Sequence, residues 1–245
     1  MTIEKYFKPS SIKEAYDLLI KEKKSVILGG GLFLRLQKST IPIAIDCMGL
    51  LSDQIELGDE IVIGAMTSLR VIECYEGLPM ALRESVSQIS GVGTRNLATI
   101  GGSVCGRYPF SDINTALIAL NAKLEFYHAG LVDMYTYNNK GLEDKDILLK
   151  IHMPKCLKSK SSYYKKVYTD FSLVNLSLVD HRLAVGARPG RPVLLEDVDF
   201  NKSAKDIISD IEFKDDFKAS GPYRRALAEA KLEDMLKELG GLHGN

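Results

Sequence analysis

The chain has 245 residues, of which 45% are hydrophobic and 26% are charged, and its formal net charge at pH 7 is +0. This is an ordinary composition for a globular protein, with enough residues to bury a sizeable core in one to three small domains. The balanced charge argues against nucleic acid or an anionic membrane as the main partner. The first residues lack a long apolar stretch, and no run approaches the length of a membrane span. We therefore expect a cytoplasmic protein.

The first fifty residues alternate between strand and helix patterns. The segment from Ser11 to Glu14 is a capping box, and it predicts a helix with one apolar face. The run from Val26 to Leu28 predicts a buried strand, which leads directly into three glycines, Gly29 to Gly31. A further strand is predicted from Ile43 to Asp46. Together these elements predict a small β-α-β-like unit.

A second unit begins near residue 55 and again mixes strands with helices. In chain order, the predicted elements are a strand at 61–65, a helix capped by Ser68, a helix with Pro79 in its first turn, a helix opened by Ser111-Asp112, strands at 123–127 and 147–151, and a polar turn at 138–141.

The basic, polar segment from Pro154 to Ser162 is the candidate domain boundary, and we expect it to be exposed. Beyond it, residues 163–167 and 181–186 predict strands, and residues 203–209 and 222–239 predict amphipathic helices. The apolar residues assigned to the inner face of the last helix are Leu227, Ala230, Leu232, Met235 and Leu239.

Metal and acid–base chemistry lack their usual sequence patterns. The four cysteines, Cys47, Cys74, Cys105 and Cys156, are far apart and form no Cys-x-x-Cys pair, which argues against a metal or iron–sulfur site in this chain. We interpret them as buried, reduced thiols. The four histidines share no motif with a serine, a cysteine or a metal ligand, and we interpret them as surface or loop residues. The sequence therefore predicts no catalytic residue and no metal ligand.

Two glycine segments carry the functional prediction. Gly29 to Gly31 follow the apolar strand at 26–28, and Gly101-Gly102 follow a short apolar segment. Glycine lets the backbone approach a ligand closely, and a glycine turn ahead of a helix start can hold phosphate oxygens. For one Gly-Gly pair alone, an ordinary tight turn would be the better interpretation. Two such segments could face each other across a long ligand. Neither segment is a P-loop or a nicotinamide-dinucleotide fingerprint.

The second segment also carries a family resemblance. The stretch Gly93-Thr94-Arg95-Asn96-Leu97-Ala98-Thr99-Ile100-Gly101-Gly102-Ser103, with Pro109, Ser111-Asp112 and the run 117–120, resembles the FAD-binding medium subunit of the molybdenum hydroxylases, of the xanthine dehydrogenase and carbon monoxide dehydrogenase type. The glycines at 29–31 stand where that family carries its first FAD loop. The resemblance covers nearly the whole chain.

This resemblance implies an α+β fold in two parts. A two-lobed FAD-binding domain of the vanillyl-alcohol oxidase and p-cresol methylhydroxylase type would cover residues 1–154, with lobes at about 1–54 and 55–154. A C-terminal α+β domain would cover residues 163–240.

The resemblance also implies which residues bind FAD. The two glycine segments would hold the pyrophosphate and the adjoining ribityl and ribose, and the backbone at 147–148 would meet the isoalloxazine. Asp112 would help to hold the adenosine end or its loop, although a carboxylate favoured by a helix N-terminus is an equally good interpretation. Lys165 or Lys166 would lie near the flavin, unless it is a solvated strand residue. The full implied set is Ile27, Leu28, Gly29, Gly30, Gly31, Leu32, Phe33, Leu34, Ala98, Thr99, Ile100, Gly101, Gly102, Ser103, Asp112, Ile147, Leu148, Lys165 and Lys166.

The implied function is electron transfer by a flavoprotein subunit of a xanthine dehydrogenase-like complex. FAD would pass electrons from iron–sulfur clusters to NAD or another acceptor. The molybdopterin and the [2Fe-2S] clusters would lie in a large molybdopterin-binding subunit and a small iron–sulfur subunit. One departure keeps an alternative open, because Leu28 to Leu32 replace the family's alanine-glycine-glycine-threonine-aspartate and so lack two polar ligands. The alternative is a structural or assembly subunit with weakened or lost flavin binding.

Overall fold

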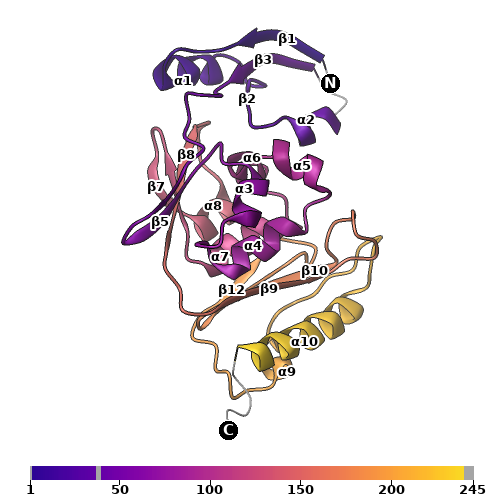
Figure 1. Cartoon of the computed structure of the whole chain (residues 1–245). Helices are drawn as coiled ribbons and strands as arrows, with labels where there is room; N and C mark the ends of the chain where they lie inside the picture. Colours follow the sequence, from indigo (N-terminus) through magenta and orange to yellow (C-terminus); the bar gives the residue numbers. More distant parts are fainter. Residues whose placement is uncertain (1, 37–39, 240–245) are drawn as a thin grey trace.

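The computed structural model describes residues 2–36 and 40–239, and its strands form three sheets stacked along the length of the molecule (Figure 1). The first sheet comes from residues 2–46, the second from 55–154 and the third from 159–195. Helices and strands are mixed in every part, so the predicted α+β class is confirmed.

The first sheet is parallel, with strand order β1-β3-β2. Its elements are β1 (Thr2–Phe7), α1 (Ile12–Lys21), β2 (Val26–Leu28), α2 (Leu32–Leu36) and β3 (Thr40–Asp46). The predicted cap is confirmed, because the Ser11 side chain accepts a hydrogen bond from the Glu14 N–H. Ala15 and Leu19 of α1 are buried against the sheet.

The second sheet is antiparallel, with strand order β4-β5-β8-β6-β7, so its last strand in the sequence lies at its centre. Its unit consists of β4 (Ile55–Leu57), β5 (Glu60–Gly64), α3 (Leu69–Cys74), α4 (Met80–Ser87), α5 (Val92–Leu97), α6 (Ile100–Cys105), α7 (Asp112–Ala119), β6 (Lys123–Phe126), β7 (Gly130–Asp133), α8 (Met134–Lys140) and β8 (Leu148–Pro154). Ser68 and Ser111 cap α3 and α7 as predicted.

His152 joins three neighbouring strands of this second sheet. From β8 it contacts Glu60 of β5 through Nδ1 at 2.9 Å and Glu125 of β6 through Nε2 at 2.8 Å. Partial burial of the ring lowers its pKa, but the hydrogen bonds to the two carboxylates outweigh that effect, and the pKa of His152 is raised. The protonated ring therefore stabilises the folded sheet.

The third sheet is antiparallel, with strand order β12-β11-β10-β9. Its unit consists of β9 (Ser159–Tyr164), β10 (Val174–Val179), β11 (Arg182–Gly186), β12 (Val193–Leu195), α9 (Ala204–Ile207) and α10 (Gly221–Glu238). Figure 1 shows this sheet between α4 and α7 on one side and α10 on the other. Because side chains alternate along a strand, Val174, Leu176 and Leu178 pack in the core with α10, whereas Asn175 and Ser177 bond toward the opposite side.

Four local predictions were wrong. Ser159 to Ser162 belong to β9, so the exposed part of the expected boundary lies before them. Residues 138–140 end helix α8 rather than forming a turn. On α10, Ala230 is exposed, and Ala228 and Leu236 are buried instead. The side chains of Cys74 and Cys105 are exposed, whereas we expected buried thiols.

Within the described ranges, no helix is long and apolar enough to cross a membrane. The same residues include no group of three or more His, Cys, Asp or Glu side chains that could hold a metal ion.

Candidate cofactor-binding site

A cavity of about 680 Å³ lies where the two glycine segments meet. One wall comes from β2 and the loop and helix after it, within residues 25–34. A second comes from the α5–α6 region, within 94–108, and a third from residues 142–148 ahead of β8. The cavity is thus built between the first and second units, from segments more than one hundred residues apart in the sequence.

The first glycine segment connects β2 to α2 as a loop. Gly30 and Gly31 have φ angles of +78° and +70°, a left-handed conformation that favours glycine. A Cβ on Gly30 would lie 1.9 Å from the Leu97 carbonyl oxygen, so this position is glycine because the loop packs on the second segment. A Cβ on Gly31 would meet nothing within 4 Å. Gly31 lines the cavity, and its missing side chain leaves space there.

The second glycine pair lies in the first turn of helix α6, and our interpretation of it as a turn was wrong. Thr99 is the N-cap, and its hydroxyl accepts the Gly102 N–H at 3.2 Å. The Gly101 N–H donates to the Ala65 carbonyl at 2.9 Å. A Cβ on Gly102 would lie 3.0 Å from the Gly29 carbonyl oxygen. These glycines therefore let three backbone segments pack closely, and their N–H groups are already engaged inside the protein.

Most of the sequence-predicted residues line this cavity. They are Ile27, Gly29, Gly31, Leu32, Phe33, Leu34, Ala98, Thr99, Gly101, Gly102, Ser103, Ile147 and Leu148. Leu28, Gly30 and Ile100 belong to the same segments but do not line the cavity. Asp112, Lys165 and Lys166 lie elsewhere.

Sequence reasoning missed Arg107 and Lys145, the cationic residues of the cavity. Arg107 lies 5.4 Å from the centre of the Tyr137 ring, and its buried Nε has no hydrogen-bond partner among the described residues. Lys145 donates to the Ser25 carbonyl at 2.8 Å, and partial burial lowers its pKa. Neither residue stands in a motif that would have marked it. The guanidinium of Arg107 brings a positive charge to the cavity wall, which suits an anionic ligand.

Acidic residues and a thiol also line the cavity, namely Glu143, Asp144, Asp146 and Cys105. Asp146 accepts backbone hydrogen bonds from His128 and Ala129, so it holds the chain in shape ahead of β8. The Cys105 side chain is exposed to the cavity but surrounded by protein, and desolvation raises the pKa of its thiol to about 11.

Aromatic rings from all three units stack beside the cavity. Phe33 stacks on Tyr108 with ring centres 4.8 Å apart, Tyr108 on Phe110 at 5.4 Å, and Phe110 packs on Phe171 at 4.0 Å. Phe33 and Tyr108 line the cavity. Their aromatic surface in the cavity wall suits a ligand with a planar ring system.

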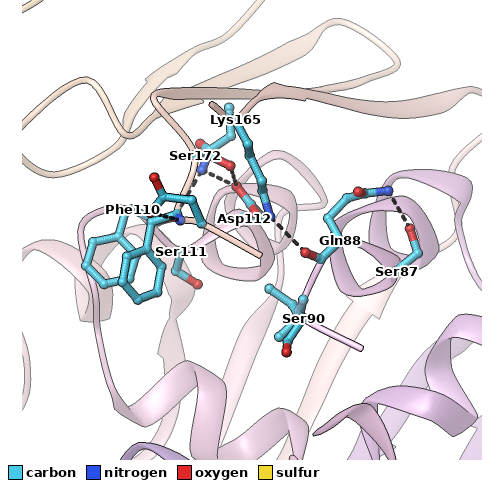
Figure 2. Close-up of polar contacts among 12 residues, drawn as sticks. Ser87, Gln88, Ser90, Phe110, Ser111, Asp112, Lys165 and Ser172 are labelled. Carbon is cyan, nitrogen blue, oxygen red and sulfur yellow. Dashed lines mark hydrogen bonds and ion pairs between the residues drawn. The ribbon is translucent and has the colours of Figure 1, made fainter. Parts of the chain in front are cut away.

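Asp112 and Lys165 form an ion pair away from the cavity, with Nζ 3.4 Å from Oδ2 and both side chains more than nine-tenths buried. The other Asp112 oxygen accepts from Ser172 at 2.7 Å and from Asn175 at 2.6 Å (Figure 2). Asp112 is the first residue of α7, which supports its interpretation as a helix N-terminal carboxylate. Lys165 is not a solvated strand residue. Lys166 donates to the Lys218 carbonyl at the surface.

Residues 1–156 match the family model of the FAD binding domain in molybdopterin dehydrogenase, and the chain belongs to this family. The resemblance carried by the motif at 93–103 is thereby confirmed.

Among individual proteins, the chain is similar to the uncharacterized protein YgfM of Escherichia coli K12, with 25% identity over 247 residues and 95% of each chain covered. Its fold is similar to a chain of CO dehydrogenase from Oligotropha carboxidovorans, with a TM-score of 0.83, 22% identity and 96% of each chain covered. It is also similar to a chain of quinoline 2-oxidoreductase from Pseudomonas putida 86, with a TM-score of 0.82, 18% identity, and 97% and 98% covered.

The cavity fits FAD, the cofactor of this family. Its volume falls within the usual range of small-molecule and cofactor sites. The bare backbone at Gly31 and the positive charge of Arg107 suit the anionic part of the cofactor, and the aromatic surface of Phe33 and Tyr108 suits a planar ring.

Proposed function

We propose that this chain is the FAD-binding electron-transfer subunit of a molybdopterin-dependent hydroxylase or dehydrogenase of the xanthine dehydrogenase type. In this function, electrons pass from iron–sulfur clusters through FAD to NAD or another acceptor. A molybdopterin-binding large subunit and an iron–sulfur small subunit would be the partners. The observation that carries the proposal is the cavity that both glycine segments line, within the part of the chain that matches the family.

FAD supplies the redox chemistry when bound, and this chain supplies binding and orientation. We assign Gly31 and Arg107 to the anionic middle of the cofactor, and Phe33 and Tyr108 to a planar ring. The segment 147–148 forms the wall ahead of β8. We further propose that residues 1–154 are the FAD-binding part, with lobes at about 1–54 and 55–154, and that residues 163–240 are the C-terminal domain.

One observation favours a second candidate, a structural or assembly subunit with weakened or lost flavin binding. The first glycine segment leads into Leu32, Phe33 and Leu34, which bring apolar side chains to the cavity. Polar residues at these places would offer hydrogen bonds to the ribityl and phosphate groups.

A binding experiment on the full-length chain separates the two candidates. We expect FAD to bind and to show the visible spectrum of a protein-bound flavin. FMN should bind at least tenfold more weakly, because it lacks the adenylate half that fills the rest of a long cavity. A folded protein that stays colourless after incubation with FAD, yet assembles with co-expressed partner subunits, would establish the assembly role instead.

A further inference from the structure

Two buried cations hold the turn between α4 and α5. Lys165 Nζ donates to the Gln88 carbonyl at 2.8 Å. Arg95 Nη1 donates to the next two carbonyls, at 3.1 Å to Ile89 and 2.7 Å to Ser90. Three consecutive carbonyl oxygens are thus fixed from two sides. Ser90 has a φ angle of +48°, which is unusual outside glycine, so the turn needs such support.

Each cation has its own carboxylate partner, of which Asp112 is buried and Glu73 is partly exposed. Arg95 forms a two-pronged contact with Glu73, at 2.8 Å from Nε and 3.1 Å from Nη2, within the second unit. Lys165 pairs with Asp112 and comes from the third unit, directly after β9. Figure 2 shows the Lys165 side chain reaching between Asp112 and Gln88. The turn is therefore held by one cation from its own unit and one from the C-terminal unit.

The Lys165–Asp112 pair lies between two helix ends. Gln88 is the C-cap of α4, and Asp112 is the first residue of α7. A cation is favoured at a helix C-terminus and an anion at an N-terminus, so both charges are stabilised where they lie. Ser172 and Asn175 satisfy the remaining Asp112 oxygen. The two helix ends and these hydrogen bonds therefore hold the Lys165–Asp112 pair in one position.

The turn at residues 88–90 lies between the proposed flavin cavity and a second cleft. Ile89 lines the cavity described above, as does Thr94, whose hydroxyl lies 3.2 Å from that of Ser90. Gln88 and Lys165 line a separate open cleft of about 510 Å³ between α4 and β9. A shift of the turn would move the cavity wall at Ile89, with the neighbouring cleft giving it room.

We propose that Lys165 is a positioning residue, which holds the turn of residues 88–90 in place from the C-terminal unit and thereby fixes the Ile89 wall of the flavin cavity without touching FAD. This inference rests on the proposed function, because it assumes that the cavity binds FAD. If Lys165 has this role, the affinity for flavin depends on how the C-terminal unit packs against the second unit.

The test compares FAD binding by the full-length wild type with binding by Lys165→Met, Lys165→Arg and the control Lys166→Met. Lys166 is the next residue, and its ammonium donates to a surface carbonyl. We expect FAD affinity to fall about tenfold in Lys165→Met and to recover in part in Lys165→Arg. Lys166→Met should bind as the wild type does. The circular dichroism of the bound flavin should change only in Lys165→Met, a readout that a general loss of stability would not move.

Lys165→Met leaves Asp112 buried without its cation, which destabilises the fold by itself. The double variant Lys165→Met with Asp112→Asn removes that charge, so it should melt near the wild type while still binding FAD about tenfold more weakly. A double variant that binds FAD as tightly as the wild type overturns the proposal. If the wild type itself binds no FAD, the proposed function fails and this inference fails with it.

Discussion

Gly31→Asp places a carboxylate in the cavity at the position where the structure leaves space. The matched control is Gly130→Asp, at the first residue of β7, directly after the turn that joins it to β6. Gly31 and Gly130 have φ angles of +70° and +67°, and a Cβ on either would meet nothing within 4 Å. The two substitutions therefore carry the same backbone strain, about 1–2 kcal/mol each for a left-handed non-glycine residue. Of the two positions, Gly31 lines the cavity.

The expected loss of affinity follows from the added charge. Two like unit charges 4 Å apart repel by about 1 kcal/mol in bulk water and about 4 kcal/mol at an effective dielectric constant of about 20. Gly31 is half-buried, which places the repulsion between these limits. We expect Gly31→Asp to lose about 1.4–3 kcal/mol of binding free energy, roughly tenfold to more than a hundredfold in Kd.

The assay is FAD titration of both variants, followed by the visible spectrum, with thermal unfolding of the FAD-free proteins as the check on strain. The two variants should melt at similar temperatures below the wild type. Gly31→Asp binding FAD with the affinity of Gly130→Asp would refute the assignment of this loop to the anionic part of the cofactor.

Three further predictions concern other described contacts. The pKa of His152 is raised in the fold, so its stabilisation is fully present below the unfolded pKa and is lost as pH rises through the folded value. In thermal unfolding, the melting temperature of His152→Gln should therefore fall further below that of the wild type at pH 5.5 than at pH 9. An equal difference at the two pH values would contradict this. Arg95→Met removes a buried guanidinium that bonds Glu73 and two carbonyls of the turn, and it should lower the unfolding free energy by about 1.5–3 kcal/mol in chemical denaturation, whereas a loss below about 1 kcal/mol would mean that the turn does not need it. Because burial raises the Cys105 thiol pKa to about 11, iodoacetamide at pH 7.5 should label the exposed Cys74 first. At pH 9.5, FAD should slow labelling of Cys105 and leave Cys74 unaffected, and mass spectrometry of the labelled peptides decides this.

Local signals in the sequence were enough to predict much of the fold. The caps at Ser11, Ser68 and Ser111 were correctly predicted, because a side chain bonding to an N–H three residues away depends on adjacent sequence alone. The apolar run at 26–28 was also correctly predicted as a strand, because its signal again lies within a few adjacent residues. The family motif at 93–103 then supplied the FAD-binding family and its fold, which periodicity could not.

The short helices that line the cavity were missed for a physical reason. Helix α6 contains Gly101 and Gly102, and glycine disfavours helix by about 1 kcal/mol per residue. The helix forms because these glycines let it pack against the Ala65 carbonyl, in the turn that follows β5. A pattern within six residues holds no information about that neighbour.

The polar contacts of Asp112 and Lys165 were also beyond the sequence. Asp112 and Asn175 are separated by 63 residues and meet because β10 turns its polar side toward α7. Lys165 looked like one of two equivalent basic residues, yet it is buried while Lys166 reaches the surface. Which of two adjacent lysines enters a core depends on strand orientation, and that orientation is fixed by tertiary packing.

The central place of β8 has a consequence for the order of events during synthesis. A chain emerges from the ribosome N-terminus first, and this strand is the last of its sheet to be made while being the one that β5 and β6 both pair with. Residues 142–148, directly ahead of it, also complete the cavity. Until about residue 154 has been released, the nascent protein has an open sheet and an unfinished pocket. Cofactor insertion is therefore a late step, which follows translation of nearly two thirds of the chain.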